Sequence, residues 1–167
     1  MKIETVNNSA YEICLSKNFI EQKIMTNKKS FVDAALNSRK QILKKISELA
    51  KNQFGLSLSD WYESLDSKLV NDTIFYNNGI LLINRTFKEI ESNHLFFVRL
   101  QKPIALNKNL GEKIDIVFAI FIQDKIKTSS RLQILSKFSR VLKGNNFRDT
   151  IIGAKKPEDV IALLMPN

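Results

Sequence analysis

Cysteine and histidine are almost absent from this chain of 167 residues. The one cysteine, Cys14, cannot form an internal disulfide, and nothing in the sequence beside it indicates an activated thiolate. The one histidine, His94, cannot supply a metal site built from several histidines, so no metal is predicted. The sequence also has no P-loop, no nucleotide-binding glycine pattern and no nucleophile elbow, and it therefore implies no cofactor.

Long apolar runs are missing as well. The longest, residues 114–122, is interrupted by Asp115 and is far shorter than the roughly 20 residues of a membrane-spanning helix. The first residues lack the apolar core of a secretory signal, and the chain has no repeat or Pro/Gly-rich hinge. We expect a cytoplasmic protein without membrane insertion. It should form a single domain over residues 1–167, in which residues 1–18 are an extra or loosely attached segment.

Acidic residues are outnumbered, with 17 Asp and Glu against 26 Lys and Arg and a net charge of +9. Every charged residue between Asp124 and Asp149 is basic. This basic segment contains Lys125, Lys127, Arg131, Lys137, Arg140, Lys143 and Arg148. Its positive field could attract nucleic acid, although lysines also accumulate without any partner in a chain this rich in Lys, Asn and Ile. No groove-reading or aromatic motif accompanies the basic segment, which makes nucleic acid the least favoured partner.

Hydrophobic periodicity and capping residues predict helices in both halves of the chain. Ser38 and Gln41 form a capping pattern ahead of apolar residues at helical spacing, and Gly55 is a natural C-terminal stop. A second helix is expected after Ser59, and a last one begins at Pro157, whose missing amide hydrogen is harmless in a first turn.

Another helix is expected after Thr128, within the basic segment. Its apolar stripe is predicted to contain Leu135, Phe138 and Leu142. Arg131 falls on the same stripe one turn earlier, where it could bind an anion or simply extend its charged end into solvent.

Three runs rich in Ile, Val and Phe predict buried strands, at residues 79–83, 94–100 and 114–122. Their aromatic residues are expected in the core and not on a base-stacking surface. These residues are Phe96, Phe97, Phe118 and Phe121. Helices before and after a cluster of strands favour an α/β fold, a mixed β-sheet flanked by helices on both faces in three α/β/α layers.

Several blocks of sequence stand in an order that points to one family. Residues 78–84 read Asn-Gly-Ile-Leu-Leu-Ile-Asn, and residues 114–120 read Ile-Asp-Ile-Val-Phe-Ala-Ile. Residues 131–135 read Arg-Leu-Gln-Ile-Leu, and residues 154–160 read Ala-Lys-Lys-Pro-Glu-Asp-Val. Together these blocks resemble the type-2 enzyme IIA domains of the sugar phosphotransferase system, a group that includes mannitol, fructose and nitrogen-regulatory IIA proteins. The resemblance implies the same three-layer α/β/α fold.

The resemblance also shows what the chain has lost. The family motif Asn-Gly-Ile-Ala-Ile-Pro-His ends in a phosphate-accepting histidine, and Asn84 stands at that position. Arg131 stands where the family has a second histidine, and Lys68 corresponds to the basic member of a family Arg-Glu pair. Gly79 survives from the glycine-rich loop. An asparagine amide has no nucleophilic lone pair at neutral pH, so Asn84 cannot form the phosphoramidate that a histidine forms.

Asn84, Arg131, Lys68 and Gly79 are therefore predicted to mark a vestigial, possible anion-binding pocket without catalytic residues. Such a pocket would lose its access to phosphate if it were filled by Phe75 or Tyr76, which lie in the segment that corresponds to the family's glycine-rich loop.

The first hypothesis for function is a non-phosphorylatable, nitrogen-regulatory IIA-like protein that regulates by binding other proteins. The resemblance implies partners such as a histidine phosphocarrier, a transporter or a sensor kinase. The second hypothesis is phosphotransfer through another acceptor such as His94, and the third is a nucleic-acid-binding protein that uses the basic segment.

Overall fold

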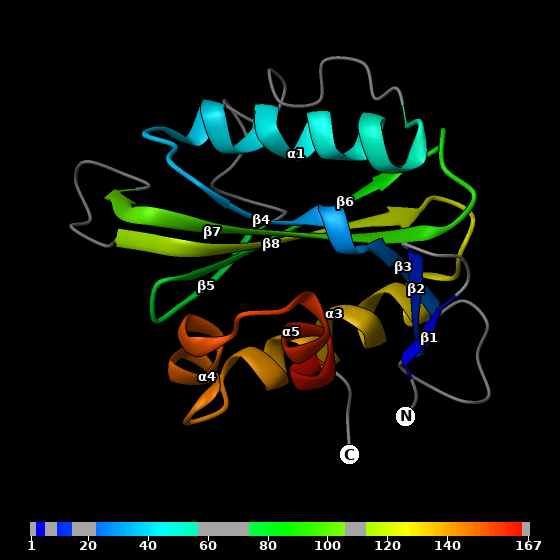
Figure 1. The fold of residues 1–167 in the computed structure, drawn as a ribbon. Helices are drawn as coiled ribbons and strands as arrows, with labels where there is room; N and C mark the ends of the chain where they lie inside the picture. The colour runs from blue at the N-terminus through cyan, green and yellow to red at the C-terminus, as the bar shows by residue number, and fades with distance from the viewer. Residues whose placement is uncertain (1–2, 6–9, 15–22, 57–73, 106–112, 165–167) are drawn as a thin grey trace. The chain divides into compact units, whose positions relative to one another are not determined.

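The computed structural model describes residues 3–5, 10–14, 23–56, 74–105 and 113–164 (Figure 1). The chain divides into two compact units. Unit 1 comprises Met1–Lys28, Thr86–Leu95 and Phe121–Asn167, and unit 2 comprises Lys29–Arg85 and Phe96–Ile120. That residues 1–167 fold as a single domain stays a prediction.

Eight strands are found in the described residues. They are β1 (Ile3–Thr5), β2 (Ala10–Cys14), β3 (Lys23–Asn27), β4 (Phe31–Ala34), β5 (Ile74–Asn77), β6 (Ile80–Phe87), β7 (Asn93–Ala105) and β8 (Lys113–Gln123). Hydrogen bonding follows the order β1-β2-β3-β7-β8-β6-β5, and β4 also pairs with β7. Since β2–β3 and β5–β6 are antiparallel while β3–β7 and β4–β7 are parallel, the sheet is mixed, as predicted.

The helices of the described residues are α1 (Arg39–Phe54), α3 (Thr128–Leu142), α4 (Phe147–Gly153) and α5 (Pro157–Leu164), with a 3-10 turn at Lys28–Ser30. None of these helices is long and apolar enough to cross a membrane. The helix expected after Ser59 lies outside the described residues. The first part of the N-terminal segment predicted as extra provides β1 and β2, whereas β3 and β4 were not predicted at all.

In unit 2, helix α1 begins and ends where its capping residues predict. Ser38 is the N-cap, and its hydroxyl oxygen accepts a hydrogen bond from the backbone N–H of Gln41 at 3.2 Å. Gly55 is left-handed with φ of 66°, and its N–H donates to the Lys51 carbonyl at 2.9 Å. Between these caps the helix buries Ile42, Leu43, Ile46, Leu49 and Ala50, so the predicted helix is confirmed.

Aromatic side chains connect the strands of unit 2. The ring centroid of Phe97 lies 5.7 Å from that of Phe31 on β4 and 5.0 Å from that of Phe118 on β8. Phe96 meets Phe54 of α1 edge-on at 5.9 Å. Because Phe96, Phe97 and Phe118 are almost fully buried, the prediction that they belong to the core is confirmed.

In unit 1, helix α3 contacts α4 and α5, and its buried stripe differs from the predicted one. The side chains that α3 buries are Ser130, Ile134, Phe138 and Leu142, whereas Leu135 and Arg131 are half-buried on its flank. The prediction that placed Leu135 on the stripe was therefore wrong by one residue. The apolar residues of α3 occupy more than one side of the helix, so their spacing alone did not define the buried side.

Other predicted elements of unit 1 are confirmed. Helix α5 starts at Pro157, with Glu158 and Asp159 in its first turn, and the Glu158 carboxylate lies 3.3 Å from the ammonium group of Lys28. Phe121, predicted as core, is fully buried and packs against Phe87 with ring centroids 4.8 Å apart.

Candidate functional site

The turn between β5 and β6 contains Gly79, which the resemblance places in the family's glycine-rich loop. Asn77 pairs with Ile80 across a two-residue turn in which Asn78 has φ of 49° and Gly79 has φ of 79°. Two positive φ values favour the Asn-Gly sequence that occupies this turn. The Gly79 carbonyl accepts hydrogen bonds from the N–H groups of Asp115 and Ile116 at 3.1 and 3.3 Å. Gly79 therefore has a structural task in unit 2, whatever it contributes to an anion site.

Asn84 does not end its strand. Strand β6 buries Ile80, Leu81, Leu82 and Ile83, and it then continues through the half-buried Asn84 to Phe87. The strand predicted at residues 79–83 therefore extends further than expected, to Phe87. Ile83 stands where the resemblance implies a proline. It has a backbone N–H, which proline lacks, and it pairs with Ile74 of β5. Position 84 lies inside β6 and not at its end, and it offers a neutral amide and no nucleophile.

Helix α3 begins with a positively charged first turn. Its N-cap is Lys127, which makes no capping hydrogen bond through its side chain, and the first turn contains no acidic residue. The partial positive charge of the free N–H groups adds to the charge of Lys127 and Arg131, so the helix start attracts anions. Ser130, which the sequence analysis did not single out, is buried in this turn, and the run Thr128-Ser129-Ser130 was the available signal.

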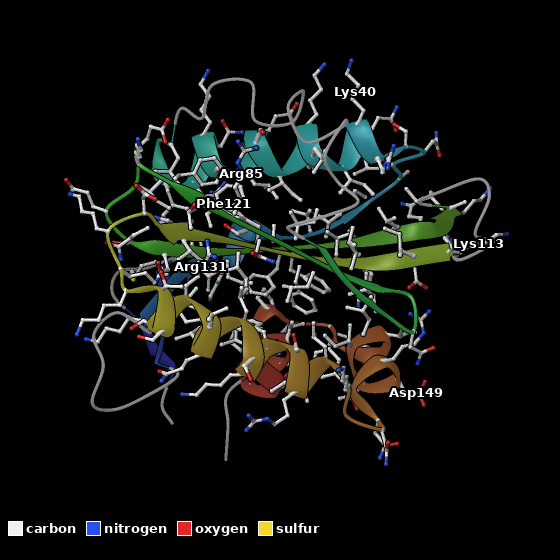
Figure 2. All side chains as sticks on the ribbon, turned by 180° about the vertical axis from the view of Figure 1, so that it is seen from behind. Lys40, Arg85, Lys113, Phe121, Arg131 and Asp149 are labelled. Atoms are coloured by element: carbon white, nitrogen blue, oxygen red, sulfur yellow. The ribbon has the colours of Figure 1, made fainter. Side chains whose placement is uncertain are left out.

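Arg131 is half-buried near the start of α3 (Figure 2). Its Nε atom is inaccessible to solvent and has no hydrogen-bond partner among the described residues. A buried guanidinium N–H that lacks a partner costs about 1–3 kcal/mol, which an anionic acceptor would offset. The half-buried side chain therefore does not simply extend into solvent, and its anion-binding role stays a prediction.

His94 is buried on β7, opposite Met25 of β3, and is 6 % exposed. Burial lowers the pKa of its imidazole from 6.5 to about 4, because the charged form loses its hydration. At neutral pH His94 is therefore neutral. Its burial also keeps it from the direct approach of a second protein that phosphotransfer requires.

The predicted pocket is not assembled in full by the described residues. Lys68 lies outside them, and of Phe75 and Tyr76 only the backbone, in β5, is described. Asn84 belongs to unit 2 and Arg131 to unit 1. Their convergence on one pocket, and the plugging of that pocket by Phe75 or Tyr76, stay predictions.

The family model described as "Phosphoenolpyruvate-dependent sugar phosphotransferase system, EIIA 2" matches residues 23–166. The chain belongs to this family. Among curated relatives, this type-2 IIA protein is 26% identical over 128 residues to the nitrogen regulatory protein of Klebsiella oxytoca, covering 76% of the chain and 78% of that protein.

Solved structures place the same fold in this family. Nitrogen regulatory protein IIA-Ntr from Neisseria meningitidis superposes with a TM-score of 0.72 at 18% identity, covering 84% of this chain and 96% of that one. The mannitol IIA domain of Escherichia coli, solved in complex with phosphorylated IIB, gives 0.63 at 10% identity and covers 80% and 92%. The predicted α/β fold, with a mixed sheet flanked by helices, is confirmed as that of type-2 IIA proteins.

Proposed function

We propose that this type-2 IIA protein is a regulator of the nitrogen-regulatory class that acts in the cytoplasm by binding other proteins and is not phosphorylated at the family site. The observation that carries the proposal is Asn84, at the family position of the phosphoaccepting histidine and inside a hydrogen-bonded strand. Phosphoryl transfer to a side chain needs a nucleophilic lone pair, which an amide nitrogen lacks.

The rest of the site supports the same proposal. Arg131 takes the place of the second histidine and can bind an anion, but it cannot carry a phosphoryl group from one protein to another. His94 is the single imidazole in the chain, and its burial in β7 disfavours the alternative that it acts as acceptor. We therefore propose a protein that keeps the family fold but whose binding is not controlled by phosphorylation.

Protein partners are proposed from the family. The mannitol IIA domain of Escherichia coli forms a complex with phosphorylated IIB, so the fold can present a surface to another protein. For this chain we propose a histidine phosphocarrier, a transporter or a sensor kinase as partner. A protein that cannot be phosphorylated stays in the equivalent of the unphosphorylated state, and it would bind such a partner constitutively.

Incubation with a phosphorylated histidine-carrier protein tests the proposal. The chain should acquire no acid-labile phosphate, while an intact nitrogen-regulatory IIA protein in the same assay becomes labelled. Acid-labile phosphate on this chain would contradict the proposal. Label that disappears in the His94→Gln variant would then assign transfer to His94, and label that persists would exclude it.

A further inference from the structure

The outer side of α3 presents one exposed leucine, with exposed cations before the helix and at its end. Its exposed residues recur at helical spacing and form a single face: Thr128, Ser129, Leu132, Gln133, Ser136 and Arg140, followed by Lys143 after the helix. We call these residues the α3 outer face. Leu132 is 55% exposed, and the other large hydrophobic residue exposed in the described parts of the chain is Ile152 of α4, at 49%.

Charge on this face has one sign. Lys125 and Lys127 precede the helix and are exposed, and Arg140 and Lys143 are exposed at its end. The chain has no acidic residue from 125 to 148, and the N-cap of α3 is uncapped by any side chain, which adds the positive end of the helix dipole. Leu132 thus lies between two pairs of cations, and Arg140 follows it by about 12 Å along the helix axis at 1.5 Å per residue.

We infer that the α3 outer face binds an acidic segment of a partner protein, which covers Leu132 with an apolar side chain and places carboxylates against the flanking cations. An apolar contact surrounded by complementary charges is the usual arrangement of a protein interface. The inference deepens the proposed function, on which it rests, by naming the chemistry of the partner.

Three other occupants fit the face less well. A second copy of this chain has a net charge of +9 and would be repelled. A membrane-surface helix needs a broad apolar side, whereas α3 turns Ile134, Phe138 and Leu142 into the core of unit 1. Single-stranded nucleic acid is bound through stacking on aromatic rings, and the large hydrophobic residues exposed in the described ranges are both aliphatic.

Helix α1 provides a control for charge alone. Its exposed side is also basic, with Lys40, Lys44 and Lys51, but it includes Glu48 and no exposed large hydrophobic residue. Figure 2 shows Lys40 projecting outward from α1. If net charge alone attracted acidic segments, α1 and α3 would respond alike to charge reversal.

The probe is a fluorescein-labelled peptide of glutamates around a central pair of leucines, whose binding to the full chain is followed by anisotropy. We expect Leu132→Ser and Arg140→Glu each to raise the Kd about tenfold, since each removes roughly one buried contact or charge pair. The matched controls Ile152→Ser on α4 and Lys40→Glu on α1 should change it less than about twofold.

Equal effects of the α3 and control substitutions would overturn the inference, as would tighter binding of a single-stranded DNA of the same length. Circular dichroism confirms that each variant is folded, and the exposure of all four side chains predicts that each will be. If the chain remains unlabelled in the phosphotransfer assay but does not bind the peptide, the inference about the α3 outer face is refuted and the proposed function is not. If the chain becomes labelled, the proposed function is refuted, whether or not the peptide binds.

Discussion

The side-chain oxygen of Asn93 accepts a hydrogen bond from the backbone N–H of Gln123 at 3.0 Å, which ties the start of β7 to the end of β8. The amide nitrogen of the same side chain donates to the backbone carbonyl of Lys23 on β3, also at 3.0 Å. Asn93 is fully buried. One side chain in unit 1 therefore satisfies polar backbone groups on β3 and β8, two of the strands that pair with β7.

Replacement of Asn93 by alanine should destabilise the protein by about 1–3 kcal/mol, because it removes the two part-buried hydrogen bonds that this buried side chain makes to the Gln123 N–H and the Lys23 carbonyl. Urea unfolding measures the change as a lower midpoint. Asn145→Ala, in the exposed turn after α3, is the matched control and should change the free energy of unfolding by less than about 0.5 kcal/mol. Equal effects of the two substitutions would show that the Asn93 hydrogen bonds contribute nothing net.

His94 should make the protein less stable in mild acid. The pKa of its imidazole is 6.5 in the unfolded reference and about 4 in the fold, so the unfolded chain binds the extra proton between these values. The stability contribution is complete above pH 6.5 and is lost as the pH falls toward 4, by roughly 3 kcal/mol in all.

Unfolding free energies of the wild type and of His94→Gln, compared at pH 7 and pH 5, isolate this effect because the carboxylates titrate in both proteins. The wild type should lose more stability than the variant over this range. The same loss in both proteins would contradict a buried, neutral His94.

Gly55 and Gly153 should respond to alanine with opposite signs. Gly55 is left-handed and no atom lies within 4 Å of an added Cβ, so Gly55→Ala should cost about 1 kcal/mol through backbone strain alone. Gly153, at the end of α4, has equal space but no positive φ, and Gly153→Ala should be neutral or stabilise by up to about 1 kcal/mol. Thermal unfolding of the two variants checks the difference.

A single replacement should not restore the family reaction. Asn84→His supplies an imidazole, but in the site that we propose Arg131 still stands in place of the second histidine and the glycine loop is still altered. We expect labelling by phosphorylated carrier protein to be at least about a hundredfold slower than that of an intact nitrogen-regulatory IIA protein, since lost stabilisation of the phosphoryl oxygens costs about that much. Near-normal labelling would show that position 84 alone separates this chain from active relatives.

The helices that were predicted correctly have capping residues close to their ends in the sequence. The N-cap Ser38, the stop at Gly55 and the first-turn Pro157 act within a few residues, so the bounds of α1 and the start of α5 could be predicted without the rest of the fold. The stripe of α3 could not be predicted in the same way, because which of Ile134 and Leu135 is buried depends on the elements against which α3 packs.

The short strands that were not predicted, β3 and β4, pair with a strand far away in the sequence. Ile24 of β3 pairs with Asn93, and Phe31 of β4 pairs with Phe97, so neither short strand carries its own evidence. The same applies to the site. The chemistry of Asn84 follows from its amide, but β6 continues past it to Phe87, beyond the residues that pair with β5, and its other neighbour in the sheet is the distant strand β8.

The turn at Asn78 and Gly79 affects how the Asn-Gly pair of the family motif should be used to search for related sequences. Both positions have positive φ, and the Gly79 carbonyl is engaged by two amides of β8, so this pair is required by the hairpin itself. Mutational drift that removes a phosphoacceptor leaves that requirement in place. A sequence search that took the Asn-Gly pair as the mark of a working phosphotransfer protein would therefore be testing for the hairpin and not for the chemistry, and it should also require a histidine five positions after the glycine.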